Sequence, residues 1–107
     1  MKIKDLGQLV ATKAVAELQE SNKEFATFVN ACLNKYLSND WGDLLEDDKQ
    51  MNDQAVKSGD ERILAAYSFP PNAQWEAIGG WGTKEDKIWI ITEWDRSVTT
   101  ILFPGEY

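Results

Sequence analysis

Hydrophobic residues recur at helical spacing through the first part of the chain. The first apolar stripe, which predicts a helix, comprises Leu6, Leu9, Val10, Ala14 and Leu18. Asp5 is placed to cap the start of this helix, with Gln8 reaching back from its first turn. The chain is therefore expected to begin with a helix.

Two further helices are predicted before residue 60. Ser21 and Glu24 form a capping box that opens the second helix, which should end near residues 38–40. Its apolar face comprises Phe25, Phe28, Val29, Cys32, Leu33 and Tyr36. A third helix is expected after Asp43, which makes a box-like pair with Glu46, and Gly59 should end it because glycine accepts the left-handed conformation.

The period changes from helical to alternating in the second half. Residues 62–69 alternate as a strand that ends at two prolines, and residues 72–86 form a long loop anchored by Trp75, Ile78 and Trp81. Residues 87–94 are apolar on both faces, which favours a central strand covered on both sides with Trp89 in the core. Residues 98–103 are rich in β-branched residues and predict a third strand.

This order of elements predicts a fold class. Helices followed by strands indicate an α+β protein, with three N-terminal helices packed on a three-stranded antiparallel β-meander. The length of 107 residues fits a single α+β domain spanning residues 1–107.

Composition narrows the possible functions. The chain has no histidine and a single cysteine, Cys32, so an imidazole base, a zinc site and an internal disulfide are all excluded. Cys32 lies in the apolar stripe of the second helix and is expected in the core. Lacking both an export signal and a span of apolar residues, the chain is expected in the cytoplasm. We expect no cofactor, no metal and no catalytic residues.

The formal net charge of −7 points to a basic partner. Nucleic acid and anionic membranes bind clustered lysine and arginine, so direct contact with either is not expected. The acids concentrate in one stretch, which comprises Asp40, Asp43, Glu46, Asp47, Asp48 and Asp53. One interpretation is a surface that imitates nucleic-acid phosphates. The other is a solvated helix whose first turn favours acids through the helix dipole.

The same carboxylates lack the ligand spacing of a calcium loop, since residues 39–43 do not have its register. A second group of polar residues lies at the predicted hairpin tip: Glu93, Asp95 and Arg96. Two carboxylates there could serve a hydrolase. The simpler interpretation is that Asp95 and Ser97 make the turn while Arg96 pairs with a neighbouring acid.

Two of the five tryptophans flank these acidic features. Trp41 lies within the acidic stretch and Trp94 beside Glu93, and tryptophan next to charge is typical of interface hot spots. We expect at least one of the two to be exposed toward a partner.

Two segments of the chain together resemble a known family. They are residues 40–59, with Asp40-Trp41-Gly42-Asp43-Leu44, Asp48-Lys49, Asn52-Asp53, Ala55 and Gly59, and residues 62–107, with Arg62 to Tyr67, Ile88 to Glu93, Asp95 to Pro104 and Glu106-Tyr107. The chain is similar to small bacterial proteins found on plasmids, phages and conjugative elements. Some of these carry a type I restriction subunit label that does not fit so short a chain without a methyltransferase motif. Residues 70–86 depart from the family pattern.

The resemblance implies a mobile-element setting, where small acidic proteins resemble inhibitors of host defence such as anti-CRISPR and anti-restriction proteins. The leading hypothesis is a non-enzymatic binding protein that blocks a basic surface of a nucleic-acid-handling host complex. The alternative is a structural or regulatory accessory protein, either monomeric or a homodimer that uses an open sheet edge or exposed tryptophans. A hydrolase using Glu93 and Asp95 is the third hypothesis.

Overall fold

The computed structural model describes residues 6–79 and 82–107, so the predicted cap Asp5 and the predicted loop anchor Trp81 lie outside the described residues. Along the chain the elements are β1 (Gln8–Ala11), α1 (Lys13–Ser21), α2 (Lys23–Leu37), α3 (Glu46–Ser58), β2 (Ile63–Ser68), β3 (Ala77–Ile78), β4 (Lys84–Glu85), β5 (Lys87–Thr92), β6 (Val98–Leu102) and the short 3₁₀ helix η2 (Pro104–Glu106). Within these ranges the main sheet has the order β1-β6-β5-β2, and β3 pairs with β4 in a separate hairpin.

The predicted three-stranded antiparallel meander is wrong as a description of the sheet. The pairs β2–β5 and β5–β6 are antiparallel as expected, but β1 adds a fourth strand that runs parallel to β6. The residues predicted to open a helix therefore form a strand, and the helix starts only at Lys13, with the Thr12 side chain accepting from the Val15 N–H. The expected loop 72–86 also contains the β3–β4 hairpin.

Tertiary contacts explain why β1 is extended. Gly7 has a φ of 61°, and a Cβ at this position would collide with the backbone oxygen of Arg96. The Thr99 hydroxyl donates to the Leu6 carbonyl at 2.7 Å, and Thr99 is itself hydrogen-bonded to Thr92 in the core. These partners are distant in sequence, so they override the local helical spacing.

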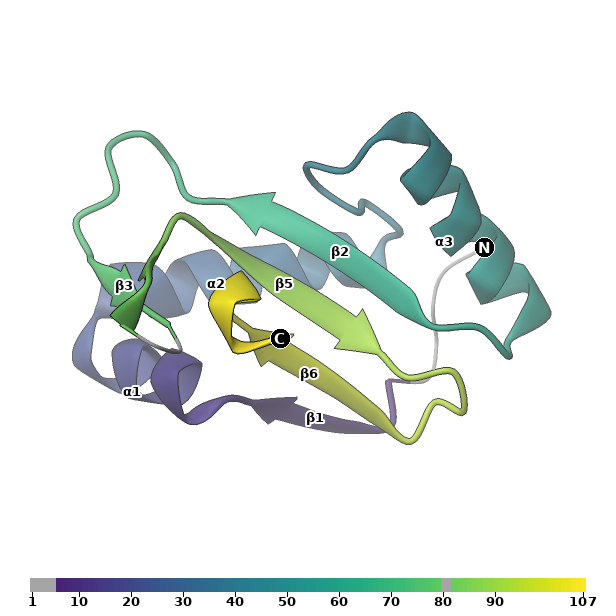
Figure 1. Cartoon of the computed structure of the whole chain (residues 1–107), viewed down its shortest axis with the longest axis horizontal. Helices are drawn as coiled ribbons and strands as arrows, with labels where there is room; N and C mark the ends of the chain where they lie inside the picture. Colours follow the sequence, from purple (N-terminus) through teal and green to yellow (C-terminus); the bar gives the residue numbers. More distant parts are fainter. Residues whose placement is uncertain (1–5, 80–81) are drawn as a thin grey trace.

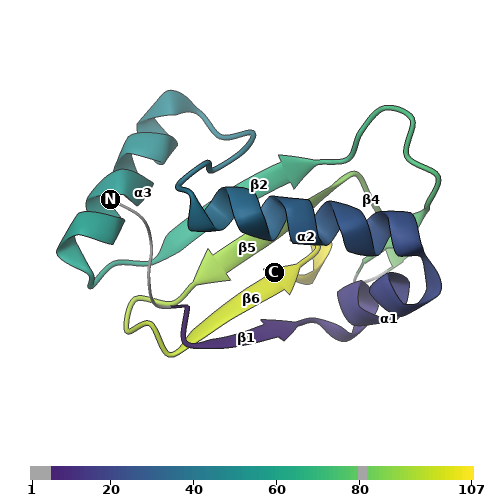
Figure 2. The ribbon, with the colours of Figure 1, turned by 180° about the vertical axis from the view of Figure 1, so that it is seen from behind.

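Helix α2 covers one face of the sheet, as Figure 2 shows. It is capped by Asn22, one residue later than predicted, and its buried residues are Phe25, Val29, Cys32 and Tyr36. The strand residues that complete this core include Ile63, Ala65, Ile88, Ile90 and Ile101. Cys32 is buried as expected, and burial raises the pKa of its thiol to about 12.

The other face of the sheet is covered differently. Figure 1 shows η2 in front of β5 and β6, while α3 lies beside β2. The predicted central position of β5 is confirmed, since it lies between β2 and β6. Trp89, however, is half-buried rather than in the core, and its ring packs on Tyr107 at 5.6 Å between centroids on the face opposite α2. The prediction that Trp89 lies in the core is therefore wrong.

Candidate functional site

The segment that carries the acidic stretch is attached along the outer edge of β2. On α3, Asn52 is buried, and its amide nitrogen donates to the Leu64 carbonyl at 2.7 Å while its amide oxygen accepts from the Leu64 N–H at 3.3 Å. A primary amide thus replaces a neighbouring strand at this position.

The loop before α3 closes the rest of this edge. The Asp43 N–H donates to the Ala66 carbonyl at 2.7 Å, and the Ala66 N–H donates to the Trp41 carbonyl at 3.3 Å. The Asp43 carboxylate accepts from the Ser68 N–H at 2.9 Å, which lowers the pKa of Asp43. The predicted role of Asp43 as a helix cap is wrong, because α3 begins at Glu46 and its N-terminus has no side-chain cap.

Trp41 is placed beneath the acidic stretch. Its exposed fraction is 2 %, its ring meets Tyr36 edge-on, and its indole N–H donates to Asp53 Oδ1 at 2.9 Å. Trp41 therefore positions Asp53 and cannot itself contact a partner in this structure, which corrects its predicted place in a binding surface. Trp94, in contrast, has an exposed fraction of 62 %.

The acids of the stretch are all exposed, but they divide into two kinds. Three of them accept hydrogen bonds from the chain: Asp40 from the Gly42 N–H, Asp43 from the Ser68 N–H and Asp53 from the Trp41 indole. The remaining three, in the first turn of α3, are Glu46, Asp47 and Asp48. The one ion pair within residues 6–79 and 82–107 joins Lys13 to Glu17, so no described cation neutralises these three.

The acids do not form a single flat face. Because an α-helix has 3.6 residues per turn, Asp48 and Asp53 lie on different sides of α3. Asp53 borders a hollow of about 290 Å³ together with Asn39, Gln54 and Lys57. Asp48 instead borders a second and larger hollow, which lies between α3 and β2.

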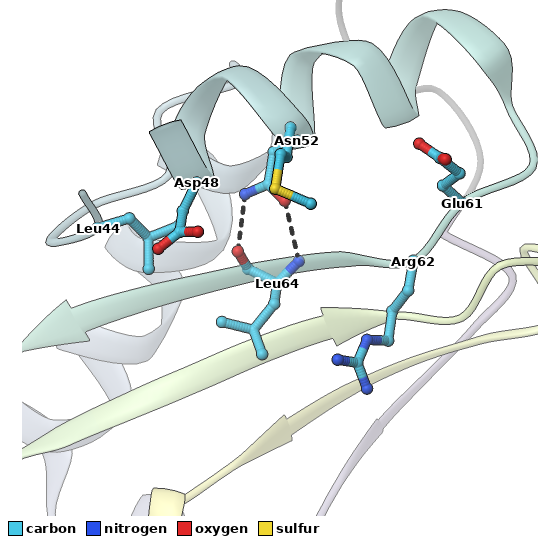
Figure 3. Close-up of a pocket in the computed structure, with 7 residues that line it drawn as sticks. Leu44, Asp48, Asn52, Glu61, Arg62 and Leu64 are labelled. Atoms are coloured by element: carbon cyan, nitrogen blue, oxygen red, sulfur yellow. Dashed lines mark hydrogen bonds between the residues drawn. The ribbon is translucent and has the colours of Figure 1, made fainter. Parts of the chain in front are cut away.

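This larger groove has a volume of about 550 Å³ and is lined by Leu44, Asp48, Met51, Asn52, Glu61, Arg62 and Leu64. In Figure 3 the Asn52 amide joins α3 to the Leu64 backbone, and the Arg62 side chain extends away from Glu61. The Arg62 guanidinium lies 5.6 Å from the centre of the Tyr107 ring and donates to the Tyr107 hydroxyl. Hereafter we call this hollow the α3–β2 groove.

Sequence reasoning missed the α3–β2 groove and the role of Asn52. In the sequence of α3, Asn52 lies between the apolar residues Met51 and Ala55. A primary amide among apolar helix positions is a signal for a buried hydrogen bond, because such a group is costly to bury without a partner.

The hairpin tip is built by backbone contacts. Asp95 Oδ1 accepts from the Ser97 N–H at 3.0 Å, which confirms the predicted turn and lowers the pKa of Asp95. Arg96 has no ion pair with an acid among the described residues, so the predicted pairing is not seen there. Its guanidinium donates instead to the carbonyls of Ala55, Glu61, Glu93 and Trp94.

Glu93 and Asp95 are the pair of carboxylates that the hydrolase hypothesis requires. The Asp95 carboxylate is exposed and is used by the turn, where it accepts from the Ser97 N–H. In the part of the chain that the structure describes, no three histidine, cysteine or acidic residues are grouped so as to hold a metal ion.

No protein-family model matches the chain, and comparisons with curated proteins and with solved structures give no match either. The resemblance to mobile-element proteins therefore remains a prediction. Among the described residues, no helix has the length and apolar character needed to cross a membrane.

Proposed function

We propose that this protein binds a basic surface of another protein through the acids at the start of α3. The observation that carries the proposal is that Glu46, Asp47 and Asp48, in the first turn of α3 where the helix dipole favours acids, hold no other described segment of the chain. They are exposed and have no ion pair with a described residue, whereas Asp40, Asp43 and Asp53 hold the local structure. Exposed charge of one sign steers an oppositely charged partner and speeds the encounter.

A nucleic-acid-binding protein is the kind of partner that presents such a basic surface. Occupying this surface would keep nucleic acid from binding there, so we propose that the protein inhibits a nucleic-acid-handling complex, of which a host defence nuclease is the candidate. The interaction depends on charge, and its strength should fall as salt screens the carboxylates.

The test is inhibition of purified defence nucleases, namely a type I restriction enzyme and a CRISPR effector, at low ionic strength. The variant Glu46→Gln/Asp47→Asn/Asp48→Asn removes the exposed acids of α3. A matched control, Glu20→Gln/Glu24→Gln/Glu76→Gln, removes the same number of charges from exposed positions elsewhere. We expect inhibition by the control but not by the α3 variant. Equal inhibition by both variants would contradict the proposal.

A self-associating accessory protein is the second candidate, and one observation favours it. The edge of β2 is closed by Asn52 and the loop before α3, whereas β1, at the other edge, pairs with β6 alone among the described strands. An open edge can accept a strand from a second copy. Light scattering over a range of concentrations separates the two candidates, because only this one requires a dimer without a basic partner.

A further inference from the structure

The α3–β2 groove has an apolar floor contributed by three separate segments. Leu44 comes from the loop before α3 and Leu64 from β2 (Figure 3), and Met51 comes from α3. Met51 has an exposed fraction of 65 %, which leaves its thioether free to contact a ligand. A volume of about 550 Å³ falls in the range of sites that take a small molecule or several side chains of a peptide.

The groove is also negatively charged. Asp48 and Glu61 line it, and neither carboxylate has a hydrogen bond or ion pair with any other described residue. The one cation in the lining is Arg62, whose guanidinium is held against Tyr107. An apolar floor with free carboxylates is complementary to a ligand that carries both apolar and cationic side chains.

The closed edge of β2 limits how a peptide could bind here. The outward-facing backbone groups of Leu64 are taken by Asn52, and the Ser68 N–H is taken by Asp43. An extended peptide therefore cannot add as a strand at this edge. Recognition must use side chains, as it does when an amphipathic helix lies in a groove.

We propose that the α3–β2 groove binds a basic amphipathic helix of the partner. Apolar side chains of that helix rest on Leu44, Met51 and Leu64, and a lysine or arginine lies beside Asp48 or Glu61. This inference rests on the proposed function, since it specifies which part of the basic partner the protein recognises.

The test uses a synthetic helix of leucine and lysine at amphipathic spacing as the probe. A peptide of the same composition in scrambled order is the control for charge alone. Binding is measured by calorimetry at low ionic strength, and the methyl group of Met51 is followed by NMR. We expect the amphipathic peptide to bind about tenfold more tightly than the scrambled one, and the Met51 methyl resonance to shift on binding.

Two pairs of variants locate the interaction. Asp48→Asn/Glu61→Gln removes the negative charges of the groove, while Glu20→Gln/Glu24→Gln removes two exposed negative charges that lie outside the groove and outside the acids at the start of α3. Met51→Ala removes part of the floor, and Leu45→Ala removes an apolar side chain that is more exposed than Met51 but lies outside the lining. We expect the groove variants to weaken binding about tenfold and the controls less than about threefold.

The outcomes separate the groove from the more general proposal. If both peptides bind equally, or if both charge variants weaken binding equally, the groove proposal fails and the general attraction to basic partners survives. An unshifted Met51 methyl in a peptide-bound sample also overturns the groove proposal. If neither peptide binds the native protein at low salt, the basic-partner function itself is contradicted.

Discussion

The side-chain amide of Asn52 makes the two hydrogen bonds that a neighbouring strand would make to Leu64. Its nitrogen donates to the Leu64 carbonyl at 2.7 Å, and its oxygen accepts from the Leu64 N–H at 3.3 Å. One residue of α3 thus fixes the helix to the sheet, closes part of an exposed edge and sets one wall of the α3–β2 groove.

Replacing Asn52 should be costly for that reason. Asn52→Leu leaves the Leu64 N–H and carbonyl without partners, and we expect the free energy of unfolding to fall by about 2–3 kcal/mol in urea titrations. Asn34→Ala, at an exposed position on α2, is the control and should change it by less than about 0.5 kcal/mol. A loss as small as the control's would show that the amide is not needed to hold α3.

Gly42 and Gly59 allow a matched comparison, because both have a φ of 75°. A Cβ on Gly42 would collide with the Ala66 carbonyl oxygen, whereas a Cβ on Gly59 meets nothing within 4 Å. We expect Gly59→Ala to destabilise by about 1 kcal/mol, the cost of the left-handed conformation, and Gly42→Ala by about 3 kcal/mol because of the added collision. Thermal unfolding of both variants checks this, and equal losses would contradict the close approach of Gly42 to β2.

Arg96 joins the hairpin tip to the end of α3. Its guanidinium donates to the Ala55 carbonyl at 2.8 Å and to the Glu61 carbonyl at 2.6 Å. We expect Arg96→Ala to lower the free energy of unfolding by about 2 kcal/mol. Arg96→Lys should recover only part of this, because an ammonium group cannot span the same carbonyls.

Hydrogen exchange at the end of α3 gives a more specific readout for Arg96. The variant should exchange faster at the last turn of α3 than the native protein does, while α2 stays protected. A uniform increase across both helices would mean that Arg96 contributes only to global stability.

Local sequence patterns predicted those helices and strands that bury one regular apolar face in the core. The apolar stripe of α2 and the alternation in β2, β5 and β6 follow directly from burial on one side of a helix or strand. The start of the chain was different, because Leu6, Leu9 and Val10 also satisfy helical spacing. Their extended conformation depends on pairing with β6, about ninety residues later, and no short-range signal reports that contact.

The acidic stretch shows the same limit at the level of the site. The exposure of its acids could be predicted, since charged residues are rarely buried. Which carboxylates hold the structure and which are free could not be predicted, because the Asp43 carboxylate accepts from Ser68, which lies in a distant segment. For the same reason the sequence did not show that Arg96 donates to backbone carbonyls of distant segments. Trp41 was misplaced for a related reason, since its indole finds a partner in Asp53 and an aromatic neighbour in Tyr36.

The hydrogen bond from Ser68 to Asp43 makes part of the stability depend on pH. The pKa of Asp43 is lowered from its ordinary value of 3.8, so the folded state binds this proton less readily than the unfolded state does. The stabilisation by Asp43 is therefore fully present above about pH 4 and is lost as the pH falls through the lowered pKa of the folded protein.

Asp43→Asn tests this dependence, because an amide can still accept the Ser68 N–H but does not titrate. We expect the native protein to be more stable than the variant near pH 7, and the difference between their urea midpoints to shrink as the pH falls below about 4. Asp47→Asn, which removes an exposed acid without a described partner, is the control and should show a smaller change over the same range. A constant difference between native protein and Asp43→Asn across the whole range would mean that the carboxylate charge does not contribute to holding β2.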